Sequence, residues 1–453
     1  MTRFLFRLTL LLVVLAPIPF GSNREWSWTL CAVLAAALTA LWVLDNLRQR
    51  GQVSLSLNPA IIILFLLTCA WVVVQMSSLV PMSWKHPMWG MAAAALDTSL
   101  PGAITLSVDD SLTALMRLVC YGLVFSLAFQ LCGDRRKAQS ALQWIALAGL
   151  VYAVYGLVVY WGDFQSVLWY YDDAFHQDVR ATFINRNNFA TYLGLSLLCA
   201  IAVFYQKLTH RQASVYHMPQ SRQMEIKQYI LKSWKPLLGL SLMVTALVST
   251  HSRGGFVSTL IGCVVLLFLL DRKQITKSIR SRVVITSAVV IAGMAFWVSS
   301  EILLNRMAQT SLDREGRITA YQVISESILD NPLHGFGYGT FTDSFRLYRT
   351  DDMKGHLNKA HNTYLENVFE LGWPAASSLL MAILGLGLTC VFGIRRRRRD
   401  WVYPSVGVAA TILVVIHSLV DFSLQIPAVA ITYACIMGVA CAQSYSSRQN
   451  PSS

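Results

Sequence analysis

Three stretches of the sequence place basic side chains at the edges of apolar runs. Arg253 lies in THSRGGFVS (residues 250–258), between two runs that are almost wholly apolar. Arg180 and Arg186 lie in VRATFINRNNFATYL, directly before another apolar run, and His361 lies in KAHNTYLENVFELGWP. Charged groups at a membrane boundary are costly unless they are solvated, paired or functional. These residues are therefore the first candidates for chemistry.

The residue types suit an anionic ligand. Arginine presents a planar fork that matches the oxygens of a phosphate, which is why Arg180 and Arg253 are the main candidates. Gly254 and Gly255 would let a ligand approach the start of a helix, where free N–H groups and the helix dipole favour anions. A histidine such as His361 can act as a general base near neutral pH. Together they predict transfer of a group from a phosphate-activated, lipid-anchored donor.

Four further residues are candidates for substrate binding. Asn362 and Glu366 are spaced with Glu370 at i, i+4 on the helix that His361 begins, so the three share one helix face. The other two are the arginines Arg186 and Arg317. We expect all four on the same side of the membrane as His361.

The main candidates also have purely structural interpretations. Arg253 could extend toward the membrane surface or pair with an acidic loop. Arg180 could be the partner of Asp178 or Asp172, and His361 could be a solvated residue at a helix start. Each alternative removes one candidate, so the functional interpretation depends on the residues acting together.

Other polar residues nearby are expected to have lesser roles. Arg186 is expected to orient its loop, and His251 is expected to face the membrane interface. Three acidic pairs could bind a divalent ion in a metal-dependent transferase: Asp109-Asp110, Asp172-Asp173 and Asp351-Asp352. Adjacent carboxylates in loops are usually solvated, so we predict no metal site.

The composition is that of a polytopic membrane protein. Of the 453 residues 55% are hydrophobic and only 13% are charged, whereas soluble domains carry roughly a quarter charged residues. The net charge of +13 resides mainly in short loops between apolar runs, which argues against nucleic-acid binding. Nearly all nine cysteines lie inside apolar runs, so we expect neither a disulfide framework nor a zinc site.

Apolar runs long enough to cross a bilayer position these candidates. A membrane helix needs about 20 mostly apolar residues, and scanning gives about twelve spans. The seventh and eighth are separated only by the Arg253 motif and predict a tight helical hairpin. The predicted spans are 4–20, 26–44, 59–80, 111–131, 141–161, 187–205, 236–250, 254–270, 283–299, 371–394, 402–419 and 426–443.

The distribution of charge predicts the orientation. With a cytoplasmic N-terminus, the inner loops hold most of the 37 lysines and arginines but few of the 24 acidic residues, as the positive-inside rule requires. Both termini are then cytoplasmic, and the candidate residues lie outside. The first run could instead be a signal peptide, but it lacks an A-x-A site and carries Pro17 and Pro19 where cleavage would occur. We expect a retained helix.

The chain is predicted to have three parts. Residues 1–299 form an N-terminal bundle of about nine spans, residues 300–370 a large outer loop region, and residues 371–453 the last spans and a cytoplasmic tail. In the loop region, Tyr321, Ile324 and Ile328 are spaced like one face of a helix, which could lie on the membrane surface. The following LHGFGYGTF is glycine-rich and suits a tight turn close to a ligand.

Five motifs occur in a fixed order over roughly residues 170–440: RATFINRNNFA, SRGG, GRITAYQVISESILDNPLHGFGYGTF, HNTYLENVFELGWP and HSLVDFSLQIPA. In this set and order the chain resembles the O-antigen ligase and O-antigen polymerase superfamily of bacterial envelope glycosyltransferases. The resemblance implies an all-α, GT-C-like membrane bundle in the bacterial inner membrane, with its active face periplasmic. It also implies a donor glycan linked to undecaprenyl diphosphate, and an acceptor that is lipid A-core or another glycan.

The resemblance also implies roles for individual residues. By motif, Arg180 and Arg253 would hold the diphosphate, and His361 would activate the acceptor hydroxyl, without a metal or other cofactor. A single displacement would invert the anomeric centre. The long stretch between Arg253 and His361, compared with a minimal ligase loop, favours a polymerase slightly over a ligase.

Two other classes of function remain open. About twelve spans is also a common layout for a transporter or flippase, although transporters usually show repeated halves and polar sites near the bilayer midplane. Here the span centres are almost free of charge. A non-catalytic assembly subunit is the other alternative, and it would not require Arg180, Arg253 and His361 together.

Overall fold

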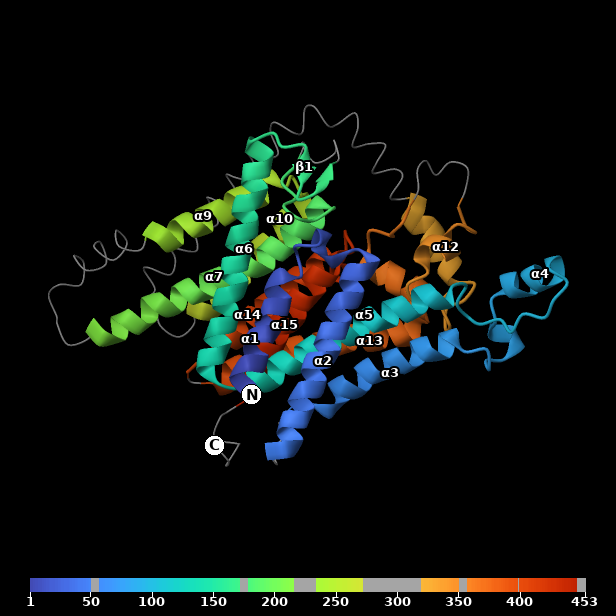
Figure 1. Cartoon of the computed structure of the whole chain (residues 1–453), viewed down its shortest axis with the longest axis horizontal. Coiled ribbons are helices and arrows are strands. Elements are labelled where there is room, and N and C mark those ends of the chain that lie inside the picture. Colours follow the sequence, from blue (N-terminus) through green and yellow to red (C-terminus); the bar gives the residue numbers. More distant parts are fainter. Residues whose placement is uncertain are drawn as a thin grey trace.

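The computed structural model describes residues 1–49, 57–171, 178–215, 234–271, 319–349, 357–397 and 399–445, and within them it is a bundle of helices (Figure 1). A two-stranded antiparallel hairpin of β1 (Ser166–Val167) and β2 (Tyr170–Tyr171) lies between α6 and α7. The helices are α1 (Thr2–Leu15), α2 (Glu25–Gln49), α3 (Pro59–Met76), α4 (Pro87–Ala95), α5 (Val108–Leu131), α6 (Arg135–Trp161), α7 (Arg186–Val215), α9 (Trp234–Ser249), α10 (Arg253–Asp271), α12 (Phe341–Phe345), α13 (Thr363–Arg396), α14 (Val402–His417) and α15 (Pro427–Ser444).

The predicted all-α polytopic fold is confirmed. Eight of the described helices are long and apolar enough to cross a membrane, and α9 and α14 are shorter apolar helices. Every predicted span coincides with a helix except 283–299, which lies outside the described residues. The predicted hairpin is present, because only residues 250–252 separate α9 from α10.

Polar residues before the apolar runs fix where several helices begin. Asn58 and Asp134 accept hydrogen bonds from backbone N–H groups two residues later, at 3.0 and 2.7 Å, and begin α3 and α6. Ser107 accepts one from Asp110 at 3.2 Å and begins α5. Such caps satisfy the free N–H groups of a first helical turn.

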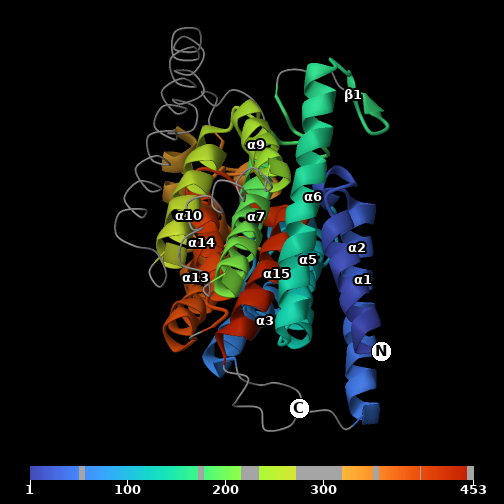
Figure 2. The same cartoon turned by 90° about the vertical axis from the view of Figure 1, so that its left-hand side faces the viewer.

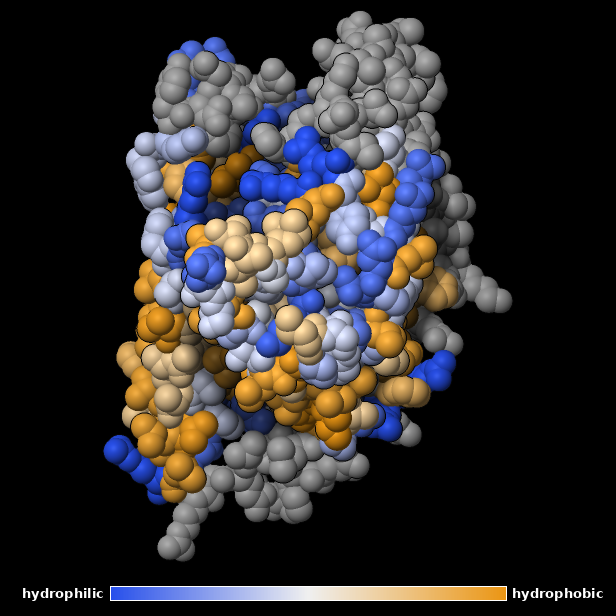
Figure 3. Space-filling model, turned by 90° about the vertical axis from the view of Figure 1, so that its right-hand side faces the viewer, coloured by the Kyte–Doolittle hydropathy of each residue, from blue (hydrophilic) through white to orange (hydrophobic). Residues whose placement is uncertain are grey.

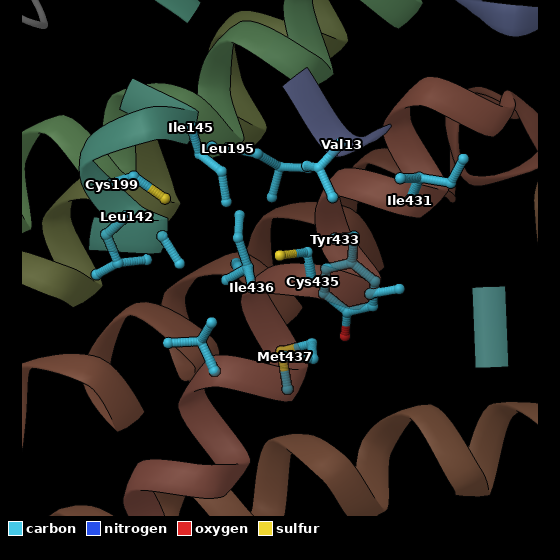
Figure 4. Close-up of a cluster of buried hydrophobic side chains, with 14 of the residues drawn as sticks. Val13, Leu142, Ile145, Leu195, Cys199, Ile431, Tyr433, Cys435, Ile436 and Met437 are labelled. Atoms are coloured by element: carbon cyan, nitrogen blue, oxygen red, sulfur yellow. The ribbon is translucent and has the colours of Figure 1, made fainter. Parts of the chain in front are cut away.

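The C-terminal helix α15 lies at the centre of the bundle (Figure 2). It is 94% buried and contacts α1, α5, α6, α7, α13 and α14. Its side chains meet those of α1, α6 and α7, as Cys435 and Ile436 do in Figure 4. Gly438 permits this packing, since a Cβ there would lie 2.6 Å from the Phe125 carbonyl oxygen of α5. The helices of the predicted N- and C-terminal parts therefore share one core.

The two ends of the bundle differ in composition. The site end joins residues 16–22, 178–186, 249–253, 357–363 and 417–427; Val179 N–H, for instance, donates to the Ser249 carbonyl at 3.0 Å. The basic end joins residues 132–135, 399–403 and 443–445, where Gln443 donates to the Cys132 carbonyl at 2.7 Å. Between the ends the surface carries many exposed hydrophobic side chains. Figure 3 shows hydrophobic residues over the lower left of one face and hydrophilic residues gathered above.

Helix α13 is broken near the site end. Gly372 has φ 75° and ψ 163°, and Pro374 follows, so the helix loses regular backbone bonds there. Residues 332–338 replace them: Phe336 N–H and Gly337 N–H donate to the carbonyls of Phe369 and Glu370, each at 3.0 Å. The break sets the direction of the first turns of α13, which carry the site residues.

The glycine-rich stretch after residue 332 is close to the chain's own backbone. A Cβ on Gly335 would lie 2.3 Å from the Glu370 carbonyl oxygen. The turn that was expected to lie close to a ligand therefore packs closely against α13. The helix that precedes this stretch is present over residues 319–328. Ile324 and Ile328 are buried against Phe336 and Phe369, so this face of the helix packs on protein, and its position at the membrane surface stays a prediction.

Candidate functional site

The turn between α14 and α15, residues 417–423, organises the site; we call it the site turn. His417 is buried, and its Nδ1 lies 3.0 Å from Thr191 Oγ1 of α7. Thr191 donates to Ser423 Oγ at 3.1 Å, and Ser423 donates to Asn188 Oδ1 at 3.0 Å. This chain of buried hydrogen bonds holds the site turn against the start of α7.

His361 lies on the other side of the site turn. Its Nδ1 is 3.3 Å from Asp421 Oδ1, and its ring meets the Phe422 ring edge-on at 5.0 Å. Asp421 is 1% exposed, and neither of its carboxylate oxygens has a hydrogen-bond donor among the described residues. A carboxylate within ion-pair distance of one imidazole nitrogen favours one orientation of the ring.

The backbone fixes the position of His361. Its φ is 51°, in the left-handed region that L-residues seldom adopt. Its carbonyl oxygen accepts a hydrogen bond from Tyr321 Oη at 2.9 Å. Next along the chain, Thr363 N–H donates to the Ser418 carbonyl at 2.9 Å, and Thr363 Oγ1 donates to the Asp421 carbonyl at 2.8 Å. The start of α13 is therefore attached directly to the site turn.

Arg253 begins α10 and is exposed. Within the described part of the chain its guanidinium has no ion pair or hydrogen bond. Gly254 lies against the site turn, because a Cβ there would be 2.8 Å from Val420 Cγ2 and 3.6 Å from the His417 ring. Gly255 lies against α7, where a Cβ would be 2.5 Å from Ala190 Cβ. The two glycines thus let the start of α10 pack closely between α7 and the site turn.

Asp178 gathers three cationic or titratable side chains. Its carboxylate is 2.7 Å from Arg186 Nη1, 3.5 Å from Arg180 Nη2 and 2.8 Å from His251 Nδ1. Burial alone would raise the pKa of Asp178, but the hydrogen bond from His251 and the charge and hydrogen bond of Arg186 outweigh it, and the pKa is lowered. The pairing of Arg180 with Asp178 is confirmed. The expectation that His251 faces the membrane interface is wrong, because its ring points to Asp178.

The hairpin tip between α9 and α10 connects the two groups of residues. His251 contacts the Asp178 group, and Gly254 three residues later contacts the site turn. His251 also has a left-handed backbone, with φ 50°. Non-glycine residues are held in this conformation only where the surroundings determine it, and such positions cluster at functional sites. The hairpin tip thus connects the Asp178 group, which includes Arg180, with the site turn, beside which His361 lies.

Two predicted binding residues have partners within the fold. Asn362 is the N-cap of α13, and its Oδ1 accepts from Tyr364 N–H at 3.0 Å and Leu365 N–H at 3.1 Å. Glu366 is fully buried and accepts from Lys359 Nζ at 2.9 Å and from Ala360 N–H at 2.8 Å. Both residues shape the segment that carries His361, and their contact with a substrate stays a prediction.

Several predicted residues lie outside the described part of the chain. These are Arg317 and the pairs Asp172-Asp173 and Asp351-Asp352. The pair Asp109-Asp110 is described and lies in the first turn of α5. Among the described residues, no group of three or more His, Cys, Asp or Glu side chains is arranged to hold a metal ion.

The sequence interpretation did not assign roles to His417, Asp421, Ser423 and Asn188. Three of them could have been found from the sequence, because the motif HSLVDFS places His417, Asp421 and Ser423 in the break between two apolar runs. Polar residues in such a break need partners or solvent. Asn188 lies inside an apolar run, and only the tertiary structure gives it a partner.

The arrangement has the elements of group transfer to a hydroxyl. His361, with Nδ1 toward Asp421, has its Nε2 available as a general base. Arg253 offers a guanidinium that has no ion pair within the described residues. Arg180, which pairs with Asp178 and is 19% exposed, adds a second cation. The cations suit the charge of a departing anion, and the imidazole suits the proton of an attacking alcohol.

Comparison with known families agrees with this chemistry. Residues 238–380 match the family model Wzy_C, described as O-antigen ligase, a segment that contains both Arg253 and His361. No curated protein matches the chain. The family match confirms the resemblance to the O-antigen ligase and polymerase superfamily. It supports a multi-pass bacterial membrane enzyme that ligates or polymerises glycans in polysaccharide assembly.

Proposed function

We propose that this chain, which carries an O-antigen ligase family segment at residues 238–380, transfers a glycan from undecaprenyl diphosphate to an acceptor hydroxyl. The observation that supports this most is that the chain beside Arg253 and the side chain of His361 both contact the site turn. Gly254, next to Arg253, lies against His417, while His361 lies 3.3 Å from Asp421 on the same turn. A cation for the leaving diphosphate and a base for the acceptor are thus carried by segments that pack on one turn.

The reaction is a single displacement. The acceptor oxygen forms a bond to the anomeric carbon as the bond from that carbon to the diphosphate oxygen breaks. His361 Nε2 takes the acceptor proton, and Asp421 stabilises the resulting imidazolium. Arg253 and Arg180 neutralise the charge that develops on the departing undecaprenyl diphosphate. One displacement inverts the anomeric configuration, and the proposed step uses no metal.

The proposed orientation places the site end in the periplasm and both termini in the cytoplasm of a bacterial inner-membrane protein. The basic end carries Arg135, Arg397 and the neighbouring arginines of residues 395–399, as expected for a cytoplasmic face. Between the two activities of the superfamily, we propose a polymerase. The support is the length of chain that separates Arg253 from His361, compared with a minimal ligase loop.

A reconstitution experiment tests the proposal. Purified protein in liposomes would receive a radiolabelled glycan on undecaprenyl diphosphate, and products would be separated on a gel. A glycosyltransferase forms a new glycosidic bond and releases the carrier diphosphate. A polymerase does so with the donor alone and gives a ladder, whereas a ligase needs added lipid A-core. Movement of the labelled lipid across the bilayer without a new bond would refute transfer and favour a flippase.

A further inference from the structure

A cavity of about 510 Å³ lies between α3, α5, α13 and α15, apart from the residues used above for transfer. Most of its lining is apolar, from residues such as Phe65, Leu118, Leu379 and Met437. Arg117 of α5 is a cation in this wall, within the membrane-spanning segment Val108–Leu131. An arginine at that depth is a functional candidate by default, because its burial in lipid is costly.

Three buried polar atoms of the cavity wall lack a hydrogen-bond partner among the described residues. They are Arg117 Nε, Tyr121 Oη and Gln425 Oε1. The Arg117 guanidinium lies over the Trp28 ring at 4.8 Å, and its charge has no carboxylate partner among the described residues. Buried polar groups normally have partners, so the convergence of three such atoms on one hollow indicates a polar ligand group.

The other charged residues of the cavity already have partners. Lys359 Nζ is 2.9 Å from Glu366 Oε1, and Glu370 Oε1 accepts from Phe341 N–H at 3.0 Å. Arg117 is therefore the cation with charge to offer, and an anionic group is its complement. A phosphate oxygen matches the fork of the guanidinium.

The cavity opens toward the lipid-facing surface. Ile62 and Leu66 of α3 and Val119 of α5 line it, yet they are 40%, 56% and 40% exposed. A hydrocarbon chain can enter between these two helices while a headgroup reaches Arg117. The cavity is thus shaped for an amphiphile, and no residue of α7, α9 or α10 contributes to its lining.

The polar end of the cavity adjoins the proposed base. Lys359 and Thr363, on either side of His361 along the chain, both line the cavity, as does Gln425 just after the site turn. Arg180 and Arg253 belong to the region around α7 and α10. Two ligands would thus reach the site turn from different sides.

We infer that this cavity binds the acceptor as a phosphate-bearing lipid, with the headgroup phosphate on Arg117 and hydrocarbon between α3 and α5. This inference rests on the proposed transfer reaction, since it assigns the second of its two substrates. The donor diphosphate occupies the side of Arg180 and Arg253, and the acceptor hydroxyl is presented to His361 from the cavity.

Lipid binding tests the site without requiring transfer. Native mass spectrometry of the delipidated full chain would compare phosphatidic acid with phosphatidylcholine of the same acyl chains. Arg117→Gln should weaken phosphatidic acid binding about 10-fold or more, the usual loss for a hydrogen bond to a charged group. Arg117→Lys should retain most of the binding, and Arg346→Gln, an exposed arginine outside the cavity, should change nothing. Wild-type affinity in Arg117→Gln would overturn the site.

A second variant acts without changing charge. Ser126 lines the cavity and is exposed, and its hydroxyl bonds only to the Gly122 carbonyl, at 2.8 Å, among the described residues. Ser126→Phe places a ring in the hydrocarbon path and should also weaken phosphatidic acid binding. Unchanged binding in this variant would overturn the proposed path between α3 and α5.

Kinetics distinguishes an acceptor from an ordinary phospholipid. The assay would use a donor whose own acceptor hydroxyl is blocked, together with a separate acceptor lipid. If the cavity binds the acceptor, excess phosphatidic acid should raise the KM for the acceptor and leave the KM for the donor unchanged. Binding without competition would assign the cavity to a structural phospholipid and overturn the acceptor assignment. Failure of the proposed function would appear separately, as the absence of a new glycosidic bond with the wild-type protein while phosphatidic acid binding still depended on Arg117.

Discussion

The two ends of the bundle hold their charged side chains in different environments. At the basic end, Arg135 is 42% exposed and pairs with Asp400 at 2.9 Å, and Arg397 reaches both Asp400 and the Tyr445 carbonyl. At the site end, Asp178 and Asp421 are almost wholly buried and face titratable or cationic side chains. Exposed arginines on regular helix ends are sufficient to anchor a membrane topology. Buried carboxylates need a specific geometry, and the site end provides it.

The two ends of the bundle also differ in how many residues have a left-handed backbone. Ala181, His251 and His361 all have left-handed φ values, of 47°, 50° and 51°, in the loops of the site end. At the basic end the segments that we describe contain one such residue, Asp400, with φ 62°. Strain of this kind persists where tertiary contacts impose it. The comparison therefore predicts that substitutions at the site end affect activity, whereas those at the basic end do not.

The largest effect is expected for His361→Ala. Removing a general base typically lowers a rate by about 10²–10⁴-fold. The transfer assay in liposomes would measure this loss, with thermal unfolding and gel filtration to establish that the variant is folded. Arg346→Gln is the control, because this exposed arginine lies outside the residues assigned to transfer. Normal transfer in folded His361→Ala would contradict the assigned base.

Arg253→Ala should have the next largest effect on the rate of transfer. Loss of one preorganised donor to a developing anion costs on the order of 10²–10³ in rate. Because Arg253 is exposed and has no ion pair within the described residues, its removal should leave the melting temperature unchanged. Arg253→Lys should restore only part of the rate, since lysine lacks the planar fork. Equal rates in Arg253→Lys and Arg253→Ala would contradict this partial rescue, and would mean that a positive charge alone does not support transfer.

Asp178→Asn is expected to affect stability more than chemistry. The carboxylate is buried but its partners are 19–33% exposed, so the loss should be about 1–3 kcal/mol, between that for an exposed and a fully buried pair. In the wild type, the stabilisation by the Asp178 carboxylate is complete at pH values above the ordinary aspartate pKa. It is lost as the pH falls through the lowered pKa of Asp178. Melting temperatures in detergent between neutral and acid pH would measure it. The asparagine variant should lack this acid-dependent part, and an identical pH profile would refute the assignment.

The smallest effect is expected for Arg135→Gln at the basic end. Arg135 is 42% exposed in its pair with Asp400, and ion pairs of solvent-exposed side chains contribute about 1 kcal/mol or less. Transfer should be unchanged, and the melting temperature should barely move. A loss of transfer in this variant, with folding intact, would remove the functional distinction between the two ends.

Much of the fold follows from the sequence, because a span in lipid must satisfy its own backbone hydrogen bonds and be apolar over its whole length. The described helices that are long enough to cross a membrane fall on the predicted spans, and the hairpin around Arg253 was predicted from its short connection. The packing of helix faces could not be predicted in the same way. Ile324 and Ile328 are spaced like one helix face, but only the structure shows that this face packs on protein.

The sequence by itself determined which residues at membrane boundaries could do chemistry, since each arginine or histidine there is locally unfavourable without a purpose. It could not determine which of them meet. His361 and Asp421 are 60 positions apart in the sequence and Asp178 and His251 are 73 apart, so only the packing of α7, α10, α13 and α14 brings each pair together. The hollow beside Arg117 likewise depends on four helices from distant parts of the chain, and no local pattern encodes its shape.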